Sequence, residues 1–183
     1  MISRMTSRSA GEPASLKSFL DALDGLPRED WEAHPGFGPL ARAWLDRNRD
    51  LRASAPEVIA ALDYQPRPPR SRFVVSNTFL VVTFVARSRG WNHIEEVRYF
   101  PRFAASAPRL AAAFEMLRDD HVTLDRALDG LRSGVDPDSA DREDTAALRA
   151  SAKAFLPLLE RHLADETDLV LPVLLEYHPG AAD

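Results

Sequence analysis

Cysteine is absent from the 183-residue chain, which excludes disulfides, thiolate catalysis and any zinc or iron–sulfur site held by thiolates. A metal ion would therefore need histidine and carboxylate ligands. Positive charge is not in excess either, since 23 lysines and arginines stand against 28 aspartates and glutamates and the formal net charge is -5. Because no overall basic field is available to hold nucleic acid or an anionic membrane, neither is expected as a partner.

Long apolar runs are also missing. The best candidate, residues 73–85, contains Ser76, Asn77 and Thr83 and is shorter than the roughly 18 apolar residues that a membrane helix needs. The polar, basic start of the chain lacks the apolar stretch of a secretory signal. These features predict a cytoplasmic protein whose residues 1–13 form a flexible tail.

Strand-like alternation does not occur over any length, whereas apolar residues recur at spacings of three and four through most of the chain. Proline clusters divide this pattern into four long segments. The expected helices cover residues 40–63, 73–100, 108–131 and 144–175, with a short extra helix at 14–26. Long helices joined by short loops favour an all-α fold, an antiparallel up-down-up-down four-helix bundle. The predicted organisation is a short helix and loop over 14–39, the bundle over 40–177 and a C-terminal tail over 178–183.

The stripes that should face the core of the last two helices contain polar residues. In the third segment the stripe is Leu110, Phe114, Leu117, His121, Leu124, Leu128 and Leu131. In the fourth it is Phe155, Leu159, His162, Glu166, Leu169 and Val173. Because a buried carboxylate without a partner is costly, His162 and Glu166 call for a nearby cation or proton.

The first two helices bring polar residues to a similar level. The second helix is expected to bury Leu80, Phe84, Ser88, Trp91 and Glu95, and the first to bury Leu45, Asn48, Arg52, Ala55, Ile59 and Leu62. Carboxylates and imidazoles concentrated in one core favour a metal site over chance. The plainer interpretation is a hydrogen-bonded polar cluster in which Arg52 or Arg98 neutralises Glu95 and Glu166.

Three sequence motifs resemble the hemerythrin-like (HHE) domain family. HLADETDLVLP, which begins at His162, has the spacing HxxxE and a proline ten residues after the histidine, like the last helix of that family. HIEEVRYFP, which begins at His93, is similar to the family's HxIEDxxYFP segment. The passage between them, residues 100–131, resembles the family's second-to-third helix connection, and the motif order agrees from residue 40 to residue 175.

The resemblance implies a non-haem di-iron centre with one histidine from helix one, HxxxE from helix two, one histidine from helix three and HxxxE from helix four. His121, His162, Glu166 and the bridging carboxylate Glu95 match this set. Trp91 stands where the family has its helix-two histidine, and Asn48 where it has its helix-one histidine. His93 is two residues from Glu95 and points away from it on a regular helix. The resemblance therefore implies that one iron pocket is lost and one is kept.

Three hypotheses follow. In the first, His121, His162, Glu166 and Glu95 bind one iron, manganese or zinc ion, and the protein handles or senses dioxygen, nitric oxide or peroxide. In the second, no metal binds and these four residues act as catalytic acids and bases on a small organic ligand. The pocket expected beside them contains Asn48, Trp91, His93, Phe84 and Tyr99. In the third, the cluster is vestigial in a structural or interaction domain. A monomer and a homodimer are both compatible with the sequence.

Overall fold

A computed structural model describes residues 26–63, 72–133, 135 and 145–177. In this part of the chain the elements are η1 (Arg28–Ala33), α2 (Pro39–Asp63), α3 (Arg72–Ile94), η2 (Glu95–Tyr99), α4 (Phe100–Ser106), η3 (Pro108–Leu110), α5 (Ala111–Ser133) and α6 (Thr145–Tyr177). No strand occurs in these residues, so the all-α prediction is confirmed. The short helix predicted at 14–26 and both predicted tails lie outside the described residues, apart from residue 26.

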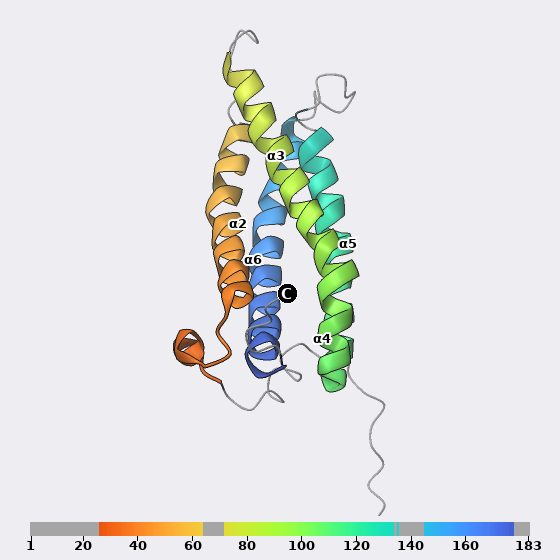
Figure 1. The fold of residues 1–183 in the computed structure, drawn as a ribbon. Coiled ribbons are helices and arrows are strands. Elements are labelled where there is room, and N and C mark those ends of the chain that lie inside the picture. The colour runs from red at the N-terminus through yellow and green to blue at the C-terminus, as the bar shows by residue number, and fades with distance from the viewer. Residues whose placement is uncertain (1–25, 64–71, 134, 136–144, 178–183) are drawn as a thin grey trace, which may run out of the picture.

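The four long helices stand side by side and alternate in direction (Figure 1). Helix α2 contacts α3 and α6, and α5 contacts the same two helices, so the four form a closed ring around one core. The short helix α4 continues the direction of α3 and contacts both α5 and α6 (Figure 1). This is the up-down-up-down bundle that the lengths of the helical segments predicted.

The second long helix does not end at Pro101, where the sequence predicted its end. It passes through the π-helical turn η2 and continues as α4 to Ser106. Proline has no N–H to donate to the carbonyls of the preceding turn. In the wider turn the N–H of Phe100 bonds to the carbonyl of Glu95, and Arg118 Nη2 of α5 donates to the carbonyl of Glu96 at 3.0 Å. The helix therefore absorbs the proline by changing register instead of breaking.

Two apolar clusters fill the bundle, one toward each end. The first contains Trp31, Trp44, Phe100, Phe103, Leu110, Phe114, Leu117 and Leu169 among others. The second contains Leu51, Val58, Val81, Phe84, Leu124, Leu128, Leu131, Phe155, Leu159 and Leu163 among others. Buried polar residues belong to neither cluster: Asn48, Ser88, Asn92, Glu95, His121, His162, Glu166 and Thr167.

The inward stripes predicted for the third and fourth helices are confirmed, because each of their residues is buried. The stripe predicted for the first helix is right in part. Asn48 and Ala55 are buried as predicted, whereas Leu45 is only half-buried and Arg52 reaches outward to Glu160, with 3.2 Å between Nε and Oε2. Trp44 and Leu51, each one residue before a predicted position, are buried in their place.

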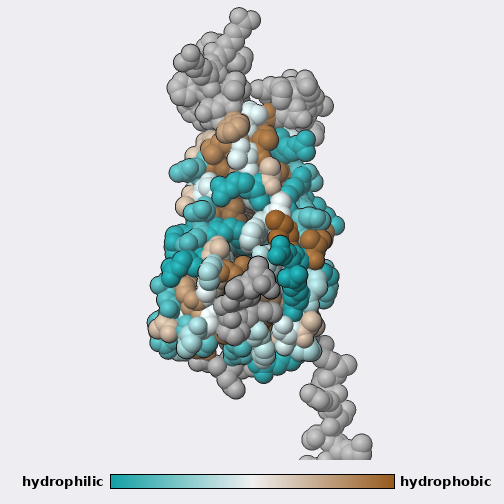
Figure 2. All heavy atoms as spheres, viewed as in Figure 1, coloured by the Kyte–Doolittle hydropathy of each residue, from teal (hydrophilic) through white to brown (hydrophobic). Residues whose placement is uncertain are grey.

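None of the helices in the described ranges is long and apolar enough to cross a membrane. On the face shown in Figure 2, hydrophilic residues are interspersed with smaller hydrophobic areas. At the end of the bundle formed by the C-terminus of α6, a side chain at Gly36 would collide with the carbonyl of Leu175, so only glycine allows the loop before α2 to pack there.

Candidate metal centre

Four residues that the sequence nominated as metal ligands meet inside the bundle. Glu95 begins η2, His121 lies in the middle of α5, and His162 and Glu166 lie one turn apart on α6. Both carboxylates have no exposed surface, and the two histidines are exposed by only 1% and 2%. The imidazole rings approach each other with 4.8 Å between their centroids.

One oxygen of each carboxylate faces the histidines. Glu95 Oε2 lies 3.3 Å from His121 Nε2, and Glu166 Oε2 lies 3.7 Å from His162 Nε2. Neither Oε2 atom has a hydrogen-bond partner, and neither does His121 Nε2, although all three are buried. Buried polar atoms without partners cost free energy and commonly mark a site for an ion, water or ligand.

The other oxygen of each carboxylate is bound by Arg47 of α2. Arg47 Nη2 lies 2.7 Å from Glu95 Oε1 and 2.5 Å from Glu166 Oε1, and its side chain is 12% exposed. The guanidinium also lies over the Trp91 ring at 4.6 Å from the centroid, a cation–π contact. One cation thus joins both acidic residues on the side opposite the histidines.

The cation beside the acids is Arg47 and not Arg52 or Arg98, the two arginines predicted for this role. Arg52 pairs with Glu160 at the surface, and exposed Arg98 lies over the Tyr99 ring. Arg47 is three residues after Trp44 and four before Leu51, so it lies on the buried side once those two define the core face. The available signal was the pattern Trp44, Arg47, Leu51, which competed with an equally regular stripe one residue later.

Aromatic residues wall the arginine side of the site. Trp44 donates its indole N–H to Glu166 Oε1. The Trp44 ring packs edge-on against Trp91 at 5.6 Å and against Tyr99 at 5.3 Å between centroids. Trp44 was not predicted to contribute, because its position fell off the stripe chosen for the first helix.

The two positions where the family pattern would place histidines have other roles. Asn48 Nδ2 donates to Thr167 Oγ1 at 2.9 Å, and Thr167 Oγ1 donates to the carbonyl of Leu163 at 2.6 Å. Trp91 packs on Arg47, as described above. His93, suggested as a pocket residue, is exposed on α3 just before the π turn, so the structure does not bring it into the cluster.

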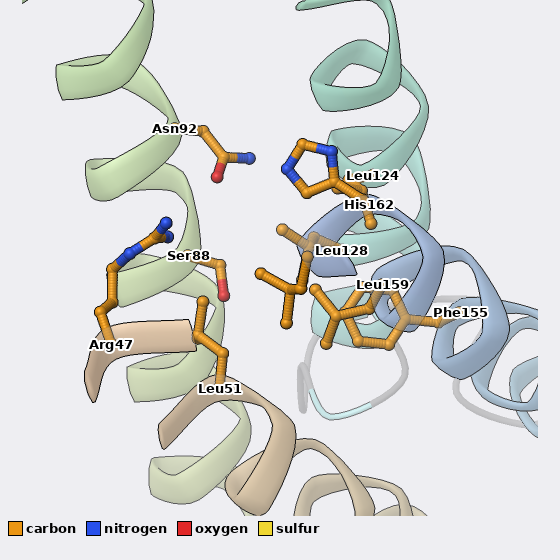
Figure 3. Close-up of a pocket in the computed structure, with 10 residues that line it drawn as sticks. Arg47, Leu51, Ser88, Asn92, Leu124, Leu128, Phe155, Leu159 and His162 are labelled. Carbon is orange, nitrogen blue, oxygen red and sulfur yellow. The ribbon is translucent and has the colours of Figure 1, made fainter. Parts of the chain in front are cut away.

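The remaining predicted pocket residues flank the site instead of lining one pocket. Phe84 belongs to the apolar cluster that contains Phe155, and Tyr99 packs against the other cluster. A cavity of about 10 Å³, enough for about one water molecule, lies beside Arg47 and His162, and neither carboxylate lines it. Figure 3 shows its lining, with Arg47, Leu51, Ser88 and Asn92 on the side of α2 and α3, and His162 on the other side among the leucines and the phenylalanine of α5 and α6. Asn92 was not nominated by the sequence, and Ser88 was only placed on the inward stripe.

Burial raises the pKa of Glu95 to about 7, although the guanidinium of Arg47 acts to lower it. Burial likewise raises the pKa of Glu166 to about 7; Arg47 again opposes the shift and the charge of Glu95 adds to it. The rise in carboxyl pKa caused by desolvation exceeds the lowering caused by Arg47, because one guanidinium cannot fully compensate the charges of two carboxylates in an interior without water. The pair therefore still attracts a proton or a second cation near neutral pH.

Imidazole nitrogens and carboxylate oxygens are donor types that bind transition-metal ions. Within the described residues, however, no group of three or more histidine, aspartate and glutamate side chains is placed so that it could hold a metal ion. Neighbouring ligand atoms on one ion lie about 3.0 Å apart in octahedral and about 3.4 Å apart in tetrahedral geometry when each bond is about 2.1 Å. The facing pair at 3.3 Å falls in this range and the pair at 3.7 Å is wider. On the opposite side, the Oε1 atoms that a second ion would need are occupied by Arg47 Nη2.

Comparison with known proteins gives one match. Residues 40–174 match the family model described as the hemerythrin HHE cation binding domain. No curated protein and no solved structure matches the chain.

Proposed function

Because the chain belongs to the hemerythrin HHE cation binding domain family, we propose that it binds a single transition-metal ion at the buried carboxylate pair, with iron as the expected metal. The proposed ligands are His121, His162, Glu95 and Glu166. In this proposal the guanidinium of Arg47 takes the place of a second metal ion.

The division of the carboxylate oxygens between two sides carries the proposal. Both Oε1 atoms are bound to Arg47, whereas both Oε2 atoms face imidazole nitrogens and lack hydrogen-bond partners. One side is thus already neutralised by a cation that belongs to the chain. The other side presents two nitrogens and two oxygens, a recognised donor set for a mononuclear non-haem site with open positions.

Charge balance also supports one ion. With both carboxylates ionised, Arg47 leaves a net charge of -1 in a buried site, and this charge favours a bound cation or a proton. A divalent ion at this site would be repelled by the guanidinium of Arg47, and the charges of the two carboxylates can offset this repulsion. A second divalent ion would add further repulsion and would find neither a free Oε1 atom nor an imidazole beside it.

A bound iron would supply an open position for a small ligand such as dioxygen, nitric oxide or peroxide. The residues around the site would determine which small molecules can reach this open position. The cavity of about 10 Å³ beside His162 has room for one very small molecule, and Ser88 and Asn92 place polar groups on its wall. We propose that the ligand is such a small molecule and that the site handles or senses it.

The alternative of an acid–base site for an organic ligand is weaker because the carboxylates are not open to a molecule of that size. A cleft of about 390 Å³ does open between α2 and α3, lined by Arg47, Arg87, Trp91 and five smaller residues. Both Glu95 and Glu166, however, have no exposed surface. An organic molecule in that cleft would contact the outer side of Arg47 and would not reach the acids.

The test is elemental analysis of the purified, tag-free chain after anaerobic iron loading. The expected result is about one metal ion per chain for the wild type, loss of that ion in His162→Ala, and retention in His93→Ala, whose histidine is exposed. A stoichiometry near two would overturn the role given to Arg47. A stoichiometry near zero, or equal metal content in both variants, would overturn the metal site itself.

A further inference from the structure

We propose that Glu96 is a positioning residue that fixes the tautomer of His121, so that its Nε2 atom is unprotonated and faces the metal position. The role proposed for Glu96 rests on the metal site proposed above. The contact between Glu96 and His121 itself does not depend on a bound ion. Glu96 itself is not a proposed ligand, because it contacts the far side of the ring.

The hydrogen bond on the outer ring nitrogen determines the tautomer. His121 Nδ1 lies 2.8 Å from Glu96 Oε1. An ionised carboxylate only accepts hydrogen bonds, so the proton of this bond belongs to Nδ1 and a neutral ring leaves Nε2 bare. The bare Nε2 then faces Glu95 Oε2 at 3.3 Å, and no hydrogen bond joins them. Two hydrogen-bond acceptors that face each other in a buried site favour a cation between them.

The π turn explains how two consecutive residues can act on one ring. In a regular α-helix, neighbouring side chains diverge by about 100°, and only one of them would point at α5. The wider turn of η2 reduces this divergence. Glu95 and Glu96 therefore approach opposite nitrogens of His121, one at Nε2 and the other at Nδ1. Arg118 holds the turn in place through the carbonyl of Glu96.

His162 has no hydrogen bond at Nδ1 comparable to the one between His121 and Glu96. His162 Nδ1 lies 3.8 Å from Asp120 Oδ2, which is beyond hydrogen-bond distance, and Asp120 Oδ1 is bound to Arg161 Nη2 at 2.7 Å. The structure therefore assigns the two histidines different degrees of constraint. His121 is held in one tautomer, whereas Asp120 constrains His162 only loosely.

The first readout needs no metal. Nitrogen-15 NMR of the chelator-treated chain under mildly alkaline conditions distinguishes protonated from bare ring nitrogens. We expect His121 to carry its proton on Nδ1 in the wild type. In Glu96→Met, which removes the acceptor from a side chain that is 35% exposed, we expect the proton to move to Nε2 and bond to Glu95. In Glu96→Gln, whose amide oxygen still accepts, we expect the wild-type tautomer to predominate. A wild-type ring protonated on Nε2, or no change in Glu96→Met, would overturn the proposal.

The second readout is the dissociation constant for Co²⁺, followed by its visible absorption. Loss of a carboxylate that orients a ligating histidine typically weakens metal binding about 10- to 100-fold, and we expect that range for Glu96→Met. The matched control is Glu57→Met on α2, an exposed glutamate in a helix position away from the π turn, and it should change the constant less than about threefold. We expect Asp120→Asn to have a smaller effect than Glu96→Met; an equal or larger effect would contradict the proposed difference between the histidines.

The two readouts separate this inference from the metal site on which it rests. If the wild type binds no Co²⁺ but shows the Nδ1-protonated tautomer that Glu96→Met reverses, the metal proposal fails and the positioning role of Glu96 stands. If Co²⁺ binds and Glu96→Met alters neither the tautomer nor the affinity, the metal proposal stands and the role of Glu96 is refuted.

Discussion

Replacing Arg47 with methionine is the most direct perturbation of the site, because it removes the charge and keeps a chain of similar length. In the metal-free protein, Glu95 and Glu166 would lose the cation that lies 2.7 and 2.5 Å from their oxygens. Each pair contributes a gross attraction of about 4 kcal/mol at an effective dielectric constant near 20, and the desolvation of the guanidinium offsets part of it. We expect a net loss of about 3–5 kcal/mol in the free energy of unfolding, the range seen when one member of a buried ion pair is removed.

Urea denaturation in the presence of a chelator measures this loss, and the matched control is Arg49→Met. Arg49 lies two residues further along α2 and pairs with Asp46 at 2.8 Å, but its side chain is 71% exposed. Exposed pairs contribute about 0–1 kcal/mol, so the control should stay within that range of the wild type. For a chain of this size the Arg47→Met loss corresponds to a melting temperature roughly 6–20 °C lower. Equal stabilities for the two variants would refute the view that Arg47 compensates the buried acids.

Three further predictions concern the ion stoichiometry, the core and the pH dependence. Combining Asn48→His and Trp91→His with removal of the Arg47 side chain should raise the metal content from about one to about two ions per chain by elemental analysis; unchanged content would mean that the second pocket is not recoverable. Leu128→Ala, in the apolar cluster away from the acids, should cost about 2–5 kcal/mol in urea denaturation and leave the metal content unchanged. Because burial raises the pKa of both site carboxyls from 4.5 to about 7, the folded state binds more protons than the unfolded state between these values, so the stability of the metal-free chain should fall as pH rises from about 4.5 to about 7. Denaturation midpoints that rise across that interval in the presence of chelator would contradict this direction.

The number, order and antiparallel packing of the long helices follow from local information. Every residue placed on the predicted stripes of α5 and α6 is buried, including His121, His162 and Glu166. The stripes did not include all buried residues, because residues 169–175 of α6 are buried on all sides. The family resemblance, confirmed over residues 40–174, placed Glu95 with these three residues.

The first two helices were harder because their sequences permit more than one phase. In α2, the stripe through Leu45 and Arg52 and the stripe through Trp44 and Leu51 have equal spacing. Burying the larger aromatic ring against the other helices decided between them, and this rotation carried Arg47 inward. The sequence of α2 alone does not reveal which of the two stripes is buried, because that depends on the side chains of α3 and α6 that face α2.

The sequence by itself determined an all-α bundle and a layer of acids and imidazoles inside it, because periodicity is a property of single helices. The prediction that Asn48 and Trp91 replace two ligand histidines came from the family resemblance and not from periodicity. Only the tertiary structure decided which cation meets the acids and which oxygen of each carboxylate stays unpaired. It also decided that a π turn brings Glu95 and Glu96 to opposite sides of one ring. Those features depend on the rotation and register of helices against one another, which are set when side chains from distant segments compete to fill the same interior.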